Sequence, residues 1–556
     1  MKFKHGWSLL IFIVLTVLIT WPLVLHPAAL TAAGREEFLL SYLMNWDIQA
    51  LTTKPGTIFQ VPFFYPLKDT LAFSDPLLTS AILALPFVKI FHQPFLAYSF
   101  NLFLSFVLNG FSVYLVVYLL TKHWWASLIS GALFAFSIGQ IDTIEHLQVL
   151  TMYWIPLGIY FLIKFFRQPS HRYALLVTSC FLCQILNTIF LGYVFIFTLS
   201  IFTLIAFIKR QIKRAHFLLL GQYFLLAFVV LFLVFQPYLR VARTWQAGRS
   251  LKDVFAGSAY FLEYFYPTHS SRLETLAQAI IVKHPWPAYL GAVVSILGAL
   301  SLMTAFRSTK TKTTFLVFLT GLVMSFGPYF QIIKQKLSLP LPLPYWLSYY
   351  LIPGFKSMRV PQRWSHLALL GLSLLIGLWL AGVFKKIKPM WVKLFSLLII
   401  ILIVTEIRLP LFVKSVPTLT QIPPVYPWLL SQQPSIVLEL PIQTWVMPLH
   451  DLEIERLYYH SFLLPARHVF INGYSGFEPP EWTKTISILR TLPIEEAISQ
   501  LKVLQVKLII IHEQEMLTLY QKDKEALPLK ATLETIRNSQ QFIKVYGDET
   551  TSVYQI

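Results

Sequence analysis

The segment KFKHGWSLLIFIVLTVLITWPLVL occupies residues 2–25 of the chain. Two lysines and a histidine precede a mainly apolar run from Trp7 to about Leu25, which is long enough to cross a bilayer core of about 30 Å. No A-x-A cleavage site accompanies the run, and further apolar runs follow it. We therefore interpret this segment as an uncleaved first membrane span and not as a signal peptide that is removed.

The composition of the whole chain indicates a membrane protein with several spans. Hydrophobic residues make up 56% of the 556 residues, charged residues make up 13%, and the mean hydropathy is +0.62. A soluble domain of this length does not need so much apolar surface. The net charge of +19 would suggest nucleic-acid binding in a soluble protein. Here Lys and Arg cluster in short loops between spans and no basic-aromatic module is present, so we expect no nucleic-acid partner.

Apolar runs long enough to span the bilayer lie near residues 7–29, 95–121, 124–140, 147–166, 173–190, 191–208, 216–239, 286–306, 313–333, 363–384 and 390–409. A further run, 75–91, is short and contains Pro76 and Pro86. Lys2 and Lys4 place the N-terminus in the cytoplasm by the positive-inside rule. If 75–91 does not cross, the basic loops that follow also lie in the cytoplasm, whereas a crossing would move all of them outside. We therefore predict about eleven spans, an interfacial or re-entrant helix at 75–91, and an external C-terminus.

The predicted fold is an all-α polytopic membrane domain followed by a small extracytoplasmic α/β domain. The membrane domain covers residues 1–409, with external loops at 30–94, 240–285 and 334–362, and the α/β domain covers residues 410–556. In the second domain, residues 435–440 and 506–511 read as strands, 495–504 as a helix and 542–556 as a terminal hairpin. We expect a multi-pass protein of the plasma (inner) membrane.

Cys180 and Cys183 are the two cysteines of the chain, and they stand at C-x-x-C spacing within an apolar run. Two thiols without a neighbouring His do not make a zinc site. We interpret them as packing residues.

Two adjacent acids, Glu36 and Glu37, follow the first span in GREEFLLS (residues 34–41). Only 26 residues of the chain are acidic, so a carboxylate pair beside a membrane is a candidate site. Residues 36–50 predict an amphipathic helix, with both glutamates, Ser41, Asn45 and Asp47 away from its apolar stripe. Such a helix can rest in the membrane interface with its carboxylates facing a cavity. The alternative is that these acids face water near a helix N-terminus.

Basic residues in the external loops break the rule that places the other loops. Arg240, Arg243, Arg249 and Lys252 follow the seventh span, and Lys356, Arg359 and Arg363 precede the tenth. Guanidinium groups suit phosphate oxygens, and at this depth the natural phosphate is a lipid headgroup. We expect Arg359 and Arg363, which flank Pro361, to bind a lipid phosphate together with Lys356 and Arg243. The alternative is that these side chains extend to ordinary headgroups.

A short external turn carries polar residues at the mouth of two helices. Its members are Asp142, Glu145, His146 and Gln148. They could hold a sugar, line a polar mouth or cap a helix, and His146 with Glu145 is too sparse to predict a metal.

Several short segments resemble the GT-C superfamily of integral-membrane glycosyltransferases, which use polyprenyl-phosphate sugar donors. More specifically, they resemble the large prokaryotic membrane proteins of the YfhO type and those with the RgtA/B/C/D-like domain. The matching segments are residues 134–137, 146–148 with 154–157, 258–259, 342–345, 353–355 with 359–361, and 472–476. This order along the chain is more specific than any one segment. Where the family usually has Gly-Asp, this chain has residues 34–37, and Thr143 replaces the first His of an H-x-x-H-L-Q turn.

The resemblance implies a membrane enzyme that moves a sugar from a polyprenyl-phosphate donor to an extracytoplasmic glycan or protein acceptor. Glu37 or Glu36 would be the base, Arg359 with Arg363 would stabilise the departing lipid phosphate, and Asp142, His146 and Gln148 would shape the sugar pocket. A divalent cation is compatible with this reaction, but no ligand set demands one. The alternatives are a lipid-linked-glycan transporter or flippase, a scaffold for a cell-envelope complex, and a degenerate transferase kept for binding.

Overall fold

The computed structural model describes residues 2–32, 35–211, 213–245, 248–277, 288–334, 337–444, 451–492, 494–522 and 534–556. The chain forms two compact units. The first unit contains residues 1–26, 100–234 and 248–413, and the second contains residues 27–99, 235–247 and 414–556. Residues from three separate stretches of the sequence therefore build each unit.

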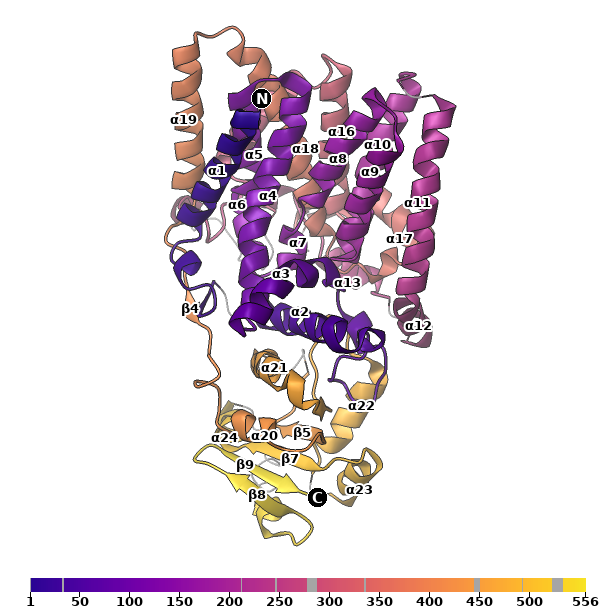
Figure 1. The fold of residues 1–556 in the computed structure, drawn as a ribbon, viewed down its shortest axis with the longest axis vertical. Coiled ribbons are helices and arrows are strands. Elements are labelled where there is room, and N and C mark those ends of the chain that lie inside the picture. The colour runs from indigo at the N-terminus through magenta and orange to yellow at the C-terminus, as the bar shows by residue number, and fades with distance from the viewer. Residues whose placement is uncertain are drawn as a thin grey trace. The chain divides into compact units, whose positions relative to one another are not determined.

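Long helices dominate the first unit, and the helices that contact one another run alongside each other in Figure 1. They are α1 (Lys2–Ile19), α4 (Leu96–Thr121), α5 (Trp124–Ala135), α8 (Trp154–Arg167), α9 (His171–Ile185), α10 (Ile189–Ile208), α11 (Arg214–Val234), α15 (Ala292–Leu302), α16 (Thr309–Ser325), α18 (Ser365–Phe384) and α19 (Pro389–Glu406). Shorter elements connect them: α6 (Ile138–Ile141), α7 (Leu147–Leu150), α13 (Leu251–Ala256), α14 (Glu274–Ala277), α17 (Pro344–Leu351) and the hairpin of β2 (Tyr329–Ile333) and β3 (Leu337–Pro342).

Helix α18 is the buried centre of this unit and packs against α5, α15 and α16. Glycines allow α16 and α18 to approach closely. A Cβ added at Gly321 would lie 2.2 Å from the backbone nitrogen of Ala368, and one added at Gly371 would lie 2.3 Å from that of Phe318. Close approach through small residues is the usual way in which helices associate inside a membrane.

Among the described residues, six helical segments are long and apolar enough to cross a membrane. They are Leu96–Thr121, Leu147–Arg167, Ile189–Ile208, Arg214–Val234, Pro361–Phe384 and Pro389–Glu406. The other predicted runs contain shorter regular helices, because turns interrupt them: α5 ends at Ala135, for example, and α16 at Ser325. These six helical segments agree with a multi-pass membrane protein. The count of eleven spans and the orientation of the termini stay predictions.

The second unit is built on a five-stranded sheet with the strand order β6-β5-β7-β9-β8. Strands β5 (Ile436–Leu440), β6 (Val469–Phe470) and β7 (Leu508–His512) are parallel, and β8 (Ile543–Gly547) and β9 (Thr551–Gln555) form an antiparallel hairpin. Helix α23 (Glu495–Val503) precedes β7. The predicted strands, helix and terminal hairpin of this region are therefore confirmed, because each depends on a local apolar pattern.

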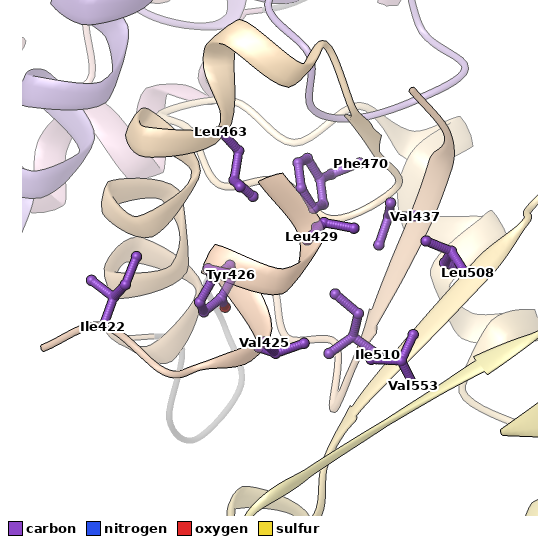
Figure 2. Close-up of a cluster of buried hydrophobic side chains, with 10 residues drawn as sticks. All are labelled: Ile422, Val425, Tyr426, Leu429, Val437, Leu463, Phe470, Leu508, Ile510 and Val553. Atoms are coloured by element: carbon purple, nitrogen blue, oxygen red, sulfur yellow. The ribbon is translucent and has the colours of Figure 1, made fainter. Parts of the chain in front are cut away.

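Helices α20 (Val425–Leu430) and α21 (Asp451–Leu463) contribute to a hydrophobic core with the sheet. Figure 2 shows its ten side chains: Ile422, Val425, Tyr426, Leu429, Val437, Leu463, Phe470, Leu508, Ile510 and Val553. Helices α22 (Pro480–Leu489) and α24 (Glu513–Lys522) complete the C-terminal part of this unit.

The N-terminal part of the second unit contains α2 (Glu36–Thr53) and α3 (Leu78–Phe91), and α12 (Gln236–Trp245) also belongs to the unit. A two-stranded sheet of β1 (Leu30–Thr31) and β4 (Lys414–Ser415) ties the first loop to the C-terminal residues. Helix α3 confirms a short helix in the run 75–91, and Ile82, Phe87, Ile90 and Phe91 on it are exposed. An exposed apolar surface of this kind agrees with an interfacial helix, which stays a prediction.

Helix α2 lies at the predicted place, but its polar side does not face water. Glu37, Ser41 and Asp47 are fully buried. The helix contacts both α3 and α21, and Phe38 stacks on Tyr458 with ring centroids 4.9 Å apart. The alternative that the acids face water is therefore wrong for Glu37 and Asp47, because protein covers them. That the carboxylates face a cavity at the membrane interface stays a prediction.

Candidate functional site

A small polar cavity lies in the first unit, where the loop after α6 meets the start of α18. Its lining residues are Asp142, Thr143, His146, Val149, Gln362, Arg363 and His366. The cavity has a volume of about 20 Å³, which is enough for a water molecule or a single polar group. The structure thus brings together Asp142, His146 and Arg363, three site candidates that lie up to 221 residues apart in the sequence.

The segment that carries Arg359 and Arg363 is held in place by its own backbone. The backbone N–H of Gln362 donates to the carbonyl oxygen of Gly257 at 3.3 Å. A Cβ added at Gly257 would lie 2.4 Å from the carbonyl oxygen of Arg359, so only glycine allows this approach. The Tyr345 hydroxyl donates to the carbonyl oxygen of Met358 at 3.2 Å. Both arginines therefore belong to a segment that contacts within the protein hold in place.

Trp364 anchors the same segment from the other side. It is fully buried, and its ring makes edge contacts with Phe190 and Phe197. Arg363 and His366 lie on either side of this buried anchor in the sequence, Arg363 in the turn before α18 and His366 in its first turn.

Burial and nearby charges shift the pKa values of His146 and Asp142 in the cavity. Burial, and after it the positive charges of Arg363 and Arg359, lower the pKa of His146 to about 3. His146 is therefore neutral at pH 7 and can only donate or accept hydrogen bonds. Burial raises the pKa of Asp142 to about 6, although the hydroxyls of Ser270 and Thr268 oppose this shift. The Thr268 hydroxyl donates to Oδ2 of Asp142 at 2.8 Å.

We expect the titration of Asp142 to appear in the stability of the protein. A folded pKa of about 6, against an ordinary 3.8, means that the folded protein favours the neutral acid. This contribution is complete below about pH 4 and is lost as the pH rises to about 6. Two pKa units correspond to about 3 kcal/mol, and partial exposure reduces the expected loss to about 1–2 kcal/mol.

Asp142→Asn cannot ionise, so its thermal unfolding midpoint should rise relative to that of the wild type between about pH 4 and pH 7. Unfolding scans at several pH values in one detergent would measure the difference. A difference that stays constant with pH would contradict the expectation.

Three more of the predicted site residues belong to the first unit. Glu145 is half-buried in the loop of Asp142, and Gln148 is buried on α7. Lys356 is exposed, and its Nζ lies 5.6 Å from the ring centroids of Tyr349 and Tyr350.

The predicted acidic pair and one predicted cation belong to the second unit. Glu37 is buried and Glu36 half-buried in the first turn of α2, and Arg243 is exposed on α12. Arg240, on the same helix, pairs with Asp69 through two hydrogen bonds of 2.8 and 3.0 Å. Arg240 therefore has an acidic partner within the protein.

Sequence reasoning missed His366 and Gln362. His366 is the one histidine of the apolar run 363–384, three residues after Arg363, and this spacing is the signal that could have found it. Within the described part of the chain, no group of three or more His, Cys, Asp or Glu side chains is placed to hold a metal ion.

A second polar cluster lies in the second unit around Glu439 of β5. Its carboxylate accepts hydrogen bonds from Nε2 of His460 at 2.7 Å, Nε2 of His512 at 3.2 Å and the Tyr426 hydroxyl at 3.0 Å. Arg456, also buried, forms ion pairs with Glu453 and Glu515. This cluster lies inside a folded core, so we interpret it as structural.

The fold of the whole chain is similar to those of two solved membrane transferases. The arabinofuranosyltransferase AftD from Mycobacteria matches with a TM-score of 0.56 and 13% identity, over 100% of this chain and 40% of that one. The oligosaccharyltransferase of Archaeoglobus fulgidus in the apo form matches with a TM-score of 0.50 and 12% identity, over 93% of this chain and 70% of that one. The chain has the GT-C superfamily fold.

The GT-C resemblance of the sequence is thus confirmed at the level of the fold. The chain spans about two fifths of the length of the arabinofuranosyltransferase. No family model and no curated protein matches the chain. The narrower resemblance to the YfhO type and to the RgtA/B/C/D-like domain therefore stays a prediction.

Proposed function

We propose that this protein is a membrane glycosyltransferase that moves a sugar from a polyprenyl-phosphate donor to an extracytoplasmic acceptor. The observation that carries the proposal is the cavity of Asp142, His146, Arg363 and His366 in a chain with the GT-C fold. The two similar structures are both named as transferases of sugar groups, which supports the same class of reaction.

The cavity suits recognition of a single polar group of the donor. Its volume of about 20 Å³ excludes a whole sugar but accepts a hydroxyl or a phosphate oxygen. Arg363 supplies a fixed positive charge, and neutral His146 supplies a hydrogen bond without adding charge. Asp142 can accept from a sugar hydroxyl once it is ionised, and Glu145 and Gln148 follow it three and six residues later in the sequence.

Arg359 and Arg363 are the proposed ligands of the lipid phosphate, with Lys356 and Arg243 as further cations. When the glycosidic bond to phosphate breaks, negative charge grows on the departing lipid phosphate. A guanidinium group held beside that charge stabilises the transition state more than the ground state. Glu36 or Glu37 is the proposed base, which takes a proton from the acceptor hydroxyl.

The test uses the full chain in liposomes that contain polyprenyl-phosphate sugars, with and without a divalent cation, and measures release of the polyprenyl phosphate. We expect Arg363→Ala to lower turnover by about 10²–10³-fold. Arg363→Lys should recover only part of the loss, because an ammonium group lacks the planar fork. Arg307→Ala removes an exposed arginine elsewhere in the first unit and serves as the control.

Absence of lipid-phosphate release with every donor would contradict the proposal. Movement of the intact donor across the bilayer, with its sugar still attached, would replace it with a transporter.

A further inference from the structure

The first turn of α2, which carries the predicted acidic pair, is attached to α21. A carboxylate oxygen of Asp451 lies 3.2 Å from the guanidinium group of Arg35, the residue before this turn. Seven residues further along α21, on the same face of the helix, the ring of Tyr458 stacks on that of Phe38. The two contacts therefore lie on either side of Glu36 in the sequence.

A third ring completes the aromatic contact. Phe95 makes edge contacts with both Phe38 and Tyr458, and each pair of ring centroids is 6.0 Å apart. Tyr458 is fully buried, and its hydroxyl donates to the carbonyl oxygen of Pro417 at 3.1 Å. The backbone N–H of Phe38 donates to the carbonyl oxygen of Arg35 at 2.9 Å, so the contacts of the Phe38 ring also hold the turn that starts at Arg35.

Helix α21 is itself fixed to the sheet of the second unit. Nε2 of His460 lies 2.7 Å from a carboxylate oxygen of Glu439 on β5. The loop after α2 bonds to the edge strand β6 of the same sheet. The backbone N–H of Tyr65 donates to the carbonyl oxygen of Phe470 at 3.0 Å, and the N–H of Phe470 donates to that of Pro62 at 3.1 Å. The C-terminal residues of the unit therefore hold two parts of the first loop.

The ion pair between Arg35 and Asp451 is open to solvent, since the two side chains are 58% and 47% exposed. An exposed pair of this kind contributes little to the stability of a fold. It does limit movement of the chain just before Glu36. A general base must lie within hydrogen-bond distance of the proton that it takes, so a displacement of about 1 Å lowers the rate strongly.

We propose that Asp451 and Tyr458 are positioning residues, which hold Glu36 in place for proton transfer from the acceptor hydroxyl. This proposal rests on the proposed function, because it assigns these residues a role in the same reaction. Neither residue needs to contact a substrate, since Asp451 acts through Arg35 and Tyr458 acts through Phe38. Their loss should therefore lower the kcat of transfer and leave the KM for the donor unchanged.

The experiment uses the full chain in liposomes with polyprenyl-phosphate sugars. It measures kcat and KM for the donor, together with amide hydrogen exchange of residues 36–42. For Asp451→Asn we expect kcat to fall about ten-fold, with KM unchanged within about two-fold. The first turn of α2 should exchange faster, whereas the thermal unfolding midpoint should not change. Asp451→Glu keeps the carboxylate and should recover most of the loss, and Glu495→Gln, which removes an exposed acid of α23, is the control.

Tyr458 gives a second, independent test. Tyr458→Leu removes the stacked ring and should lower kcat in the same way. Tyr458→Phe keeps the ring and should recover most of that loss. If Tyr458→Leu does not fold, Asp451→Asn still decides, because the side chain of Asp451 is half-exposed.

An unchanged kcat in Asp451→Asn and Tyr458→Leu, beside an active wild type, would overturn the positioning role and leave the proposed function standing. A lower kcat without faster exchange of α2 would overturn it as well. A raised KM at unchanged kcat would do the same, because α21 would then act on donor binding. Absence of lipid-phosphate release from the wild type would overturn the proposed function, and the positioning role with it.

Discussion

Glu36→Gln is expected to lower the turnover of polyprenyl-phosphate sugar by about 10²–10⁴-fold, the range typical of removing a general base. A base must reach the acceptor hydroxyl to within hydrogen-bond distance. Glu36 is half-buried, whereas Glu37 is fully buried in the second unit. The exposure of the two side chains therefore favours Glu36 as the base and Glu37 as a residue that supports α2.

The comparison variant is Glu37→Gln, for which we expect lower thermal stability and a smaller loss of turnover. Glu495→Gln removes an exposed acid of α23 and controls for a general change of charge. Release of lipid phosphate in reconstituted liposomes and thermal unfolding in detergent measure the two effects separately. Loss of turnover in Glu37→Gln at unchanged stability would assign the base to Glu37. Wild-type turnover in both variants would leave neither glutamate as the base.

The sequence predicts best what depends on neighbours along the chain. Residues 435–440 and 506–511 are apolar and β-branched, and they form β5 and β7 close to the expected positions. The membrane-domain helices also follow local apolar runs. The lengths of these helices are predicted less well, because hydropathy does not show the turn after Ala135 or the hairpin after Ser325.

The contacts of α2 come from residues far away in the sequence, so the local sequence pattern cannot predict them. Phe38 stacks on Tyr458, 420 residues later, and Asn45 donates to the carbonyl oxygen of Pro94 at 2.8 Å. A helical pattern shows which residues share a face, but not that other elements will cover the polar face too.

The cavity was partly accessible to sequence reasoning. The sequence indicates Arg363 because it breaks the positive-inside rule, and it indicates Asp142 and His146 as polar residues at a predicted helix mouth. It does not indicate His366, because a lone histidine in an apolar run usually packs in a core. Only the fold shows that α18 starts beside the loop of Asp142.

Glu439 illustrates the same limit in the second unit. A glutamate in the strand IVLEL, residues 436–440, is conspicuous, but its partners come from α20, α21 and the end of β7.

Glu439→Gln is expected to lower the free energy of unfolding of the second unit by about 3–5 kcal/mol.

The reason is the number of donors that converge on one buried carboxylate. Burial alone would raise the pKa of Glu439, but the charges and hydrogen bonds of His460 and His512 hold it well below 4.5. The side chain is therefore ionised, and it accepts from both imidazoles and from the Tyr426 hydroxyl. A glutamine amide has one acceptor oxygen, and its NH₂ group would face donors that now bond to the carboxylate.

Chemical unfolding of the full chain, followed by hydrogen exchange of β5 and β7, measures the loss, and Glu495→Gln is the exposed control. Because the folded pKa lies below the ordinary value, the contribution of Glu439 is complete above about pH 4.5 and disappears as the pH falls through the folded pKa. The difference between wild type and Glu439→Gln should therefore shrink in acid. A loss below about 1 kcal/mol at neutral pH would mean that desolvation of these charges offsets their attraction, as it does in some buried ion pairs.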